Sequence, residues 1–171
     1  MARTLFVFSL IVAAALSRII PHPANVAPIT ALALFSGAYL DKKTAVLVSL
    51  AAMLLSDYFI GFYSGMLWVY GSFFAIGLIG LWLRKHKSPV SIMGASIVGS
   101  VMFFVVTNFG VWLGSQVTYQ HTLAGLALCY TAAIPFFRNT LIGDLAYVGA
   151  MFGAFELAQK MVPALKMQTE G

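Results

Sequence analysis

The sequence predicts an all-α membrane protein, a single domain of six transmembrane helices over residues 1–171. Hydrophobic residues make up 61% of the chain and charged residues only 9%, against about 25% charged residues in soluble domains. The mean hydropathy is +0.92. A chain of 171 residues has room for about six or seven spans of about 20 residues, joined by short loops. A further soluble domain is therefore not expected.

Charge is distributed along the chain as in a multi-pass membrane protein. The net charge is +5, but the Lys and Arg residues stand singly or in small groups between apolar runs. Loop charges that orient a membrane protein have this distribution. We therefore expect membrane lipid around the protein and no nucleic-acid partner. The single cysteine, Cys129, allows no disulfide within the chain.

The first span is predicted at residues 4–20, near the lower length limit for a spanning helix. A cleaved signal peptide is the alternative, since Arg3 precedes an apolar stretch with small residues at 13–15. The apolar run continues to Ile20, which favours a span. The second helix is predicted at residues 26–39, which is short for a hydrocarbon core of about 30 Å.

The turn between these two helices is the stretch around which the site is expected to form. Pro21 and Pro23 flank His22, and Asn25 follows. Proline fixes φ and lacks an N–H donor, so this turn is expected to be extended and rigid. Together with Arg18, it would present an imidazole, a carboxamide and a guanidinium at one bilayer face.

The remaining spans are predicted at residues 44–62, 66–83, 90–113 and 138–160. Asp57 and Asp144 lie within the third and the last of these, about two turns from a helix end. A carboxylate facing lipid costs several kcal/mol, so both side chains should face the interior. The segment 114–137 contains a short apolar stretch interrupted by Pro135, which favours a lid or re-entrant segment over a seventh span.

The Lys and Arg residues predict which side of the membrane each loop occupies. With six spans, eight of these residues lie on one side and two, Arg18 and Arg138, on the other. A seventh span at 123–137 would give seven against three. The positive-inside rule therefore favours six spans with both termini in the cytoplasm.

Polar and aromatic side chains then gather on the opposite, outer side. Aromatic faces offer stacking area, while carboxylates, carboxamides and arginines can orient the polar groups of a small solute. The candidate substrate-binding residues are His22, Asn25, Asp57, Tyr63, Trp68, Asn108, Trp112, Tyr119, His121, Arg138, Asn139 and Asp144.

Other interpretations of these residues stay open. Asp57 and Asp144 could form structural ion pairs with Arg18 and Arg138, and the aromatic residues suit an interfacial belt. His22 and His121 lack a third metal ligand at a suitable spacing, so neither a metal nor a cofactor is expected. No phosphate-binding loop or nucleophile elbow occurs, which argues against an enzyme.

Three stretches resemble the substrate-binding (S) components of energy-coupling factor (ECF) vitamin transporters. They are HPANVAPITALALFSGAYL from His22, LLSDYFIGFYSGMLWVY from Leu54 and GLALCYTAAIPFFRN from Gly125. The chain is still more similar to an uncharacterised bacterial membrane family described as S-component-like. The resemblance implies a six-helix bundle in the bacterial cytoplasmic (inner) membrane, with both termini cytoplasmic. Substrate would lie under the outer loops that join helices 1–2, 3–4 and 5–6.

The same resemblance implies a partner. S components dock on a transmembrane coupling protein, which works with ATPases, through an Ala-x-x-x-Ala pattern on the first helix. Here the small residues at that spacing are Ser9, Ala13 and Ser17, with Ala27 and Ala31 on the second helix. This departure leaves open whether the chain docks on such a partner or acts alone.

The sequence thus predicts a membrane-embedded binding and uptake protein for a small vitamin-like or precursor solute. Two alternatives remain. One is an intramembrane enzyme that uses Asp57, Asp144 and a histidine as acid–base groups. The other is a structural membrane factor, which would contain no pocket.

Overall fold

The computed structural model describes residues 2–17, 20, 23, 25–114, 117–162 and 165, and over these residues the protein is a bundle of helices. Over these residues the helices are α1 (Ala2–Ser17), α2 (Ile29–Tyr39), α3 (Lys42–Ile60), α4 (Met66–Leu83), α5 (Pro89–Gly114) and α6 (Leu123–Met161). The prediction of an all-α protein is confirmed. Arg18, Pro21 and His22 of the predicted proline turn lie outside the described residues.

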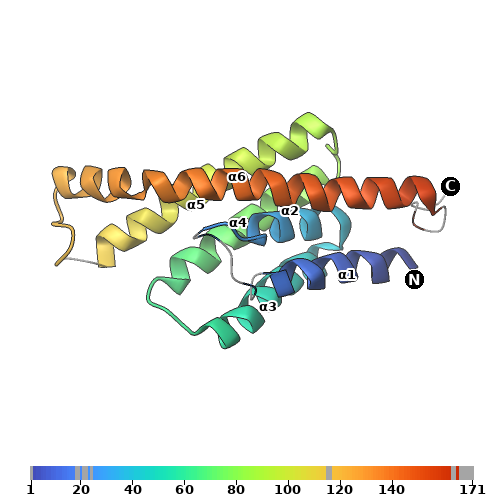
Figure 1. Cartoon of the computed structure of the whole chain (residues 1–171), viewed down its shortest axis with the longest axis horizontal. Coiled ribbons are helices and arrows are strands. Elements are labelled where there is room, and N and C mark those ends of the chain that lie inside the picture. Colours follow the sequence, from blue (N-terminus) through green and yellow to red (C-terminus); the bar gives the residue numbers. More distant parts are fainter. Residues whose placement is uncertain are drawn as a thin grey trace.

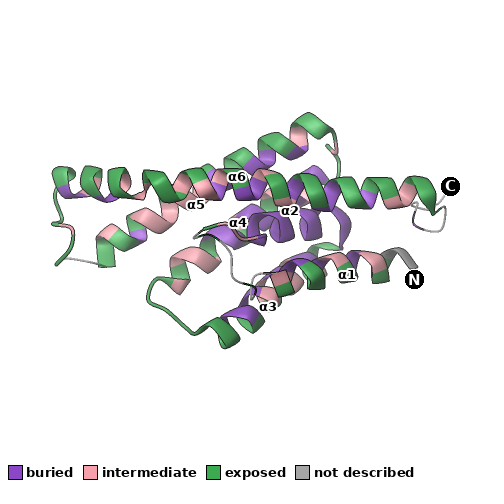
Figure 2. Ribbon diagram, in the orientation of Figure 1, coloured by how far each residue is buried: buried purple, intermediate pink, exposed green. Residues whose placement is uncertain are grey.

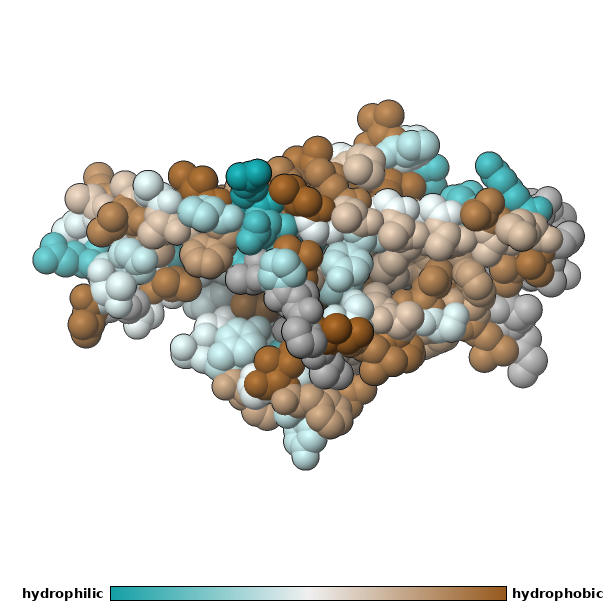
Figure 3. Space-filling view, in the orientation of Figure 1, coloured by the Kyte–Doolittle hydropathy of each residue, from teal (hydrophilic) through white to brown (hydrophobic). Residues whose placement is uncertain are grey.

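Four helices are long enough and apolar enough to cross a membrane, namely α3, α4, α5 and α6. The apolar helices α1 and α2 are shorter. Hydrophobic residues cover much of the face of the molecule shown in Figure 3, as a surface in contact with lipid would require. Length and composition therefore favour a membrane protein.

The short helix α2 lies at the centre of the fold. Each of its residues is buried, and it contacts α1, α3, α4, α5 and α6 (Figures 1 and 2). Eleven residues at about 1.5 Å each extend over about 16 Å, about half of a hydrocarbon core. Its alanine, glycine and serine residues let the neighbouring helices approach closely. The helix is therefore enclosed by protein.

The long helix α6 corrects one prediction. Residues 123–161 form one continuous helix of 39 residues that contains Pro135, so there is no separate lid before a last span. Contacts with α5 lie on both sides of the proline. The Tyr130 hydroxyl donates to the carbonyl of Val105 (2.7 Å), and the Ser100 hydroxyl donates to Asp144 (2.6 Å). This packing maintains the helix where the proline removes one backbone hydrogen bond.

The helices alternate in direction, which brings the chain's turns to two ends of the molecule. The start of α1 and the end of α6 lie at the same end as the turns α2–α3 and α4–α5 (Figure 1). The α3–α4 turn and the connection from α5 to α6 lie toward the opposite end. The short basic turns and the longer aromatic loops are thereby separated.

Candidate functional site

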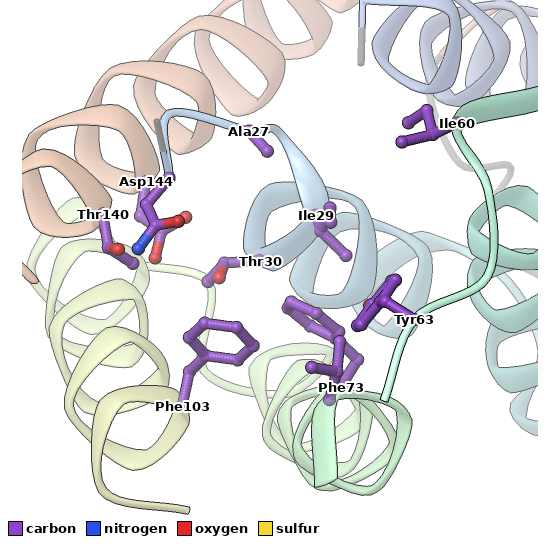
Figure 4. Close-up of a pocket in the computed structure, with 11 residues that line it drawn as sticks. Ala27, Ile29, Thr30, Ile60, Tyr63, Phe73, Phe103, Thr140 and Asp144 are labelled. Atoms are coloured by element: carbon purple, nitrogen blue, oxygen red, sulfur yellow. The ribbon is translucent and has the colours of Figure 1, made fainter. Parts of the chain in front are cut away.

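A cavity of ≈ 340 Å³ opens beside the N-terminal end of α2 (Figure 4). Its wall combines residues 25–30, the end of α3, the α3–α4 turn, and α4, α5 and α6. This volume falls in the range of about 300–1,000 Å³ that is usual for small-molecule sites. The cavity is thus large enough for a small organic solute, and five elements of the fold must be in place to form it.

One end of the cavity is polar and is centred on Asp144 of α6. The Asp144 side chain is only 3% exposed. The Ser100 hydroxyl on α5 donates to its Oδ2 atom (2.6 Å), and the Thr30 hydroxyl on α2 hydrogen-bonds the same carboxylate. Thr140 lies one turn earlier on α6 and also lines the cavity. Three helices therefore position one buried carboxylate and two threonine hydroxyls at this end.

Asn25 adds a carboxamide from the loop that precedes α2. Its backbone has φ +63°, a left-handed conformation that asparagine adopts more readily than most residues. The amide of Val26 then donates to the carbonyl of Pro23 (3.1 Å), which closes a tight turn. Asn25 lines this cavity and the one beside it, so the turn places a neutral hydrogen-bonding group where the two meet.

The rest of the wall is apolar and aromatic. Phe73 of α4 and Phe103 of α5 stack with their ring centroids 5.0 Å apart and their planes at 29°. Tyr63, from the α3–α4 turn, lies near Phe73 (Figure 4). Smaller side chains complete the surface, namely Ala27, Ile29, Ile60 and Val69. A flat, largely apolar molecule would find contact area on these rings.

Two further cavities adjoin the first and share lining residues with it. One of ≈ 230 Å³ shares Phe103 and Thr140 with the first cavity and includes Asn108, whose Nδ2 donates to the Phe104 carbonyl (2.8 Å). The other, of ≈ 580 Å³, shares Tyr63 and includes Trp68. The Trp68 indole lies against Gly110, where a Cβ atom would be 2.3 Å from Cγ of the ring. Glycine at that position allows the indole to approach the backbone of α5.

The structure divides the predicted substrate-binding residues. Asn25, Tyr63 and Asp144 line the main cavity, while Asn108 and Trp68 each line a neighbouring one.

Asp57 has a different position from the one predicted. Its side chain is 0% exposed, and one of its oxygens accepts a hydrogen bond from the Tyr70 hydroxyl (2.8 Å). It lines none of the three cavities. The prediction placed Asp57 inside the protein correctly, but its described contact joins α3 to α4.

The remaining predicted residues with described positions lie apart from the three cavities. Trp112 Nε1 donates to the carbonyl of Gln120 (3.0 Å), and His121 Nε2 donates to the carbonyl of Trp112 (3.1 Å). These two side chains therefore shape the loop between α5 and α6. The others, Tyr119, Arg138 and Asn139, also line none of the three cavities, and Arg138 is exposed. These five side chains therefore do not join Asn25, Tyr63 and Asp144 in the main cavity.

The residues that sequence reasoning missed are those that complete the polar end and the aromatic wall. In the sequence, nothing distinguishes Ser100, Thr30 and Thr140 from other hydroxyl residues within apolar helices. Hydroxyls within helices usually bond to their own backbone, as Thr140 does to the Phe136 carbonyl (3.1 Å). Only the packing of α2 and α5 against α6 shows that Ser100 and Thr30 also bond Asp144.

The amino-acid sequence matches a protein family over nearly its whole length. Residues 1–165 match the family described as "Family of unknown function (DUF6580)". The chain belongs to this family. No curated protein and no solved structure matches it.

The predicted partner-docking residues of this DUF6580 chain differ in accessibility. Ala31 is 0% exposed within α2, so its assignment to a docking surface is wrong. Ala27 is half-buried and lines the main cavity. Ser9 and Ala13 on α1 are exposed, and Ser17 is half-buried. Among these five residues, the two exposed ones lie on α1 at the four-residue spacing that close helix packing uses.

The described part of the DUF6580 chain contains neither a group of possible metal ligands nor an ion pair between Asp144 and Arg138. There, no three His, Cys, Asp or Glu side chains are grouped as a metal site would need. Asp144 is bonded to the hydroxyls of Ser100 and Thr30 and not to Arg138. The predicted pair of Asp57 with Arg18 involves a residue outside those described.

Proposed function

We propose that the protein is a membrane-embedded binding protein that takes up a small vitamin-like or precursor solute from the extracytoplasmic side. The observation that carries this proposal is the ≈ 340 Å³ cavity, with stacked aromatic rings along its wall and one buried carboxylate at its polar end. Solute sites in proteins combine a mostly apolar wall with a few placed polar groups in this way.

The position of the cavity supports binding near the outer membrane face. The cavity is built partly from the loop before α2 and from the α3–α4 turn. These segments lie away from the end of the molecule that holds the start of α1, the end of α6 and the basic α4–α5 turn (Figure 1). The positive-inside rule assigns the basic end to the cytoplasm. In this proposal the chain has six spans in a bacterial cytoplasmic membrane, and α1 and α2 are the two shorter spans. This arrangement agrees with the orientation given by the basic residues.

A coupling partner would supply the energy for uptake. Ser9 and Ala13 are exposed along α1, where small side chains would let a partner's helix approach its backbone. An ECF-type transmembrane coupling protein, acting with ATPases, would suit this surface. Uptake driven by the solute gradient, without a partner, is the alternative that the same cavity serves.

The proposal is tested by identifying small molecules that remain bound during purification in mild detergent. Ala27→Phe should fill the cavity, because Ala27 lines it from the loop before α2. Ala51→Phe is the matched control, since Ala51 is exposed on α3 and lines none of the three cavities. Mass spectrometry should detect one solute with the wild type and the control but not with Ala27→Phe. The same set of small molecules in all three samples would contradict the proposal.

A further inference from the structure

We infer that the solute carries a positively charged nitrogen and that Asp144 is its counter-ion. This inference rests on the proposed function, because it assigns a chemical class to the solute of the same cavity. It concerns the charge of the solute, which the size of the cavity does not decide.

Asp144 is buried inside the protein. Its side chain is 3% exposed in the middle of α6, a helix apolar enough to cross a membrane. A carboxylate removed from water is costly unless a cation or several hydrogen-bond donors compensate for the lost hydration. Ionisable residues within spans accordingly mark functional sites or internal pairs. The surroundings of Asp144 distinguish these two cases.

Among the described residues, the donors that bond this carboxylate are uncharged. The Ser100 and Thr30 hydroxyls bond it, and among the described residues no lysine, arginine or histidine forms an ion pair with it. A carboxylate offers about four lone-pair sites, so two hydroxyls leave acceptor capacity. Asp144 lines the cavity, so a bound solute can use that capacity.

Asp57 is the second buried carboxylate among the described residues. Asp57 is 0% exposed, bonds the Tyr70 hydroxyl and lines none of the three cavities. Asp144 is the buried carboxylate that faces solute. The two aspartates thus differ in their access to the cavity, so a change at Asp57 can serve as the control for the same change at Asp144.

The wall of the cavity that faces Asp144 is aromatic (Figure 4). Phe73, Phe103 and Tyr63 present aromatic rings, and no lysine or arginine lines the cavity among the residues described. Aromatic faces attract cations, and a single carboxylate repels an anion. The complementary solute is a small planar molecule with an apolar ring and a protonated amine, amidine or ring nitrogen at one end. An anionic acid would leave two like charges buried together.

The inference is tested with three naphthalene probes of the same size and different charge. They are 2-naphthamidine, which is cationic, 2-naphthamide, which is neutral, and 2-naphthoate, which is anionic. Binding to the purified full chain in detergent at neutral pH is measured by calorimetry. The wild type should bind the amidine at least about tenfold more tightly than the amide, and the carboxylate least of all.

Two variants assign the preference to Asp144. Asp144→Asn keeps the shape of the side chain and an oxygen that can accept from Ser100, and it should reduce the amidine's affinity about tenfold or more while leaving the amide's unchanged. Asp57→Asn, the matched control, should keep the wild-type preference. The order of the three probes on the wild type needs no variant, so the test survives if Asp144→Asn does not fold.

The outcomes separate this inference from the proposed function. Equal binding of amidine and amide, or an amidine affinity unaffected by Asp144→Asn, overturns the charge assignment and leaves a solute-binding cavity. A co-purified solute that is neutral or anionic does the same. If none of the probes binds and no solute co-purifies, the proposed function fails together with the inference.

Discussion

Gly37 and Gly80 place the backbones of α2 and α4 in direct contact. A Cβ atom on Gly37 would lie 2.6 Å from the carbonyl carbon of Gly80, and one on Gly80 would lie 2.8 Å from the carbonyl oxygens of Ala33 and Leu34. No side chain fits at this crossing. The contact holds the enclosed helix α2 against α4, and the same two helices supply Thr30 and Phe73 to the cavity.

Gly80→Ala should therefore destabilise the protein. The added methyl group would meet backbone atoms, which can yield only if the helices separate, and such overpacking costs about 1–3 kcal/mol. Thermal unfolding in detergent should show a lower Tm. The control is Gly71→Ala on the same helix, where a Cβ atom would meet nothing within 4 Å. A Tm for Gly80→Ala equal to that of the control would show that the helices are not in contact there.

Asp41 should make stability depend on pH at the start of α3. Its side chain accepts a hydrogen bond from the Thr44 amide (3.1 Å), and bonds from Thr44 lower the pKa of this carboxyl below its usual value. The stabilisation is therefore present above the unfolded-state pKa of about 3.9 and is lost as the pH falls through the lower folded-state value.

Asp41→Ala should accordingly lower the Tm at pH 7, and its difference from the wild type should shrink below about pH 4. Thermal melts at several pH values measure this. Asp41→Asn retains a capping oxygen without the titration, so its Tm at pH 7 should lie closer to the wild type. A deficit for the alanine variant that stays constant with pH would contradict the assignment of the ionised cap.

Trp112→Phe should loosen the loop between α5 and α6. The change removes the indole donor to the Gln120 carbonyl while keeping an aromatic ring. Hydrogen exchange of the amides in residues 117–122 should become faster, because the loop then opens locally at a lower free energy. Trp82→Phe, at the opposite end of the molecule, should leave exchange in this loop unchanged. Identical exchange in the wild type and Trp112→Phe would mean that the bond does not restrain the loop.

The proposed orientation predicts opposite labelling of two turns. Ser64 lies in the exposed α3–α4 turn and Lys85 in the exposed α4–α5 turn. In a Cys129→Ala background, Ser64→Cys should react with a membrane-impermeant maleimide added to intact cells. Lys85→Cys should react only after the cells are permeabilised. The reverse pattern would place the cavity on the cytoplasmic side and exclude uptake from outside by the proposed route.

The candidate site was predictable only in part. For the two aspartates, the sequence predicted burial but not their different surroundings. An ionisable residue within an apolar helix is costly, so the sequence correctly directed Asp57 and Asp144 to the interior. It could not distinguish them. Asp57 meets the Tyr70 hydroxyl because α4 packs against α3. Asp144 meets the Ser100 hydroxyl and the cavity because α5 and α2 pack against α6.

Helix positions were determined locally, because hydropathy and turn residues are properties of short stretches. The helix predicted at 66–83 occurs at Met66–Leu83, and the other early helices begin and end within three residues of their predicted bounds. Pro135 is the exception. Its local preference to end a helix yields to contacts that α6 makes with α5 on both of its sides.

Composition and the spacing of apolar runs were thus enough to determine an all-helical protein suited to a membrane, with Asp57 and Asp144 inside. Tertiary structure alone decided that α2 is enclosed, that Ser100 and Thr30 meet Asp144, and that Trp112 and His121 instead shape a loop. The physical reason is the range of the forces involved. Transfer of a segment from water depends on that segment alone, whereas a cavity exists only where several packed helices fail to fill the space between them.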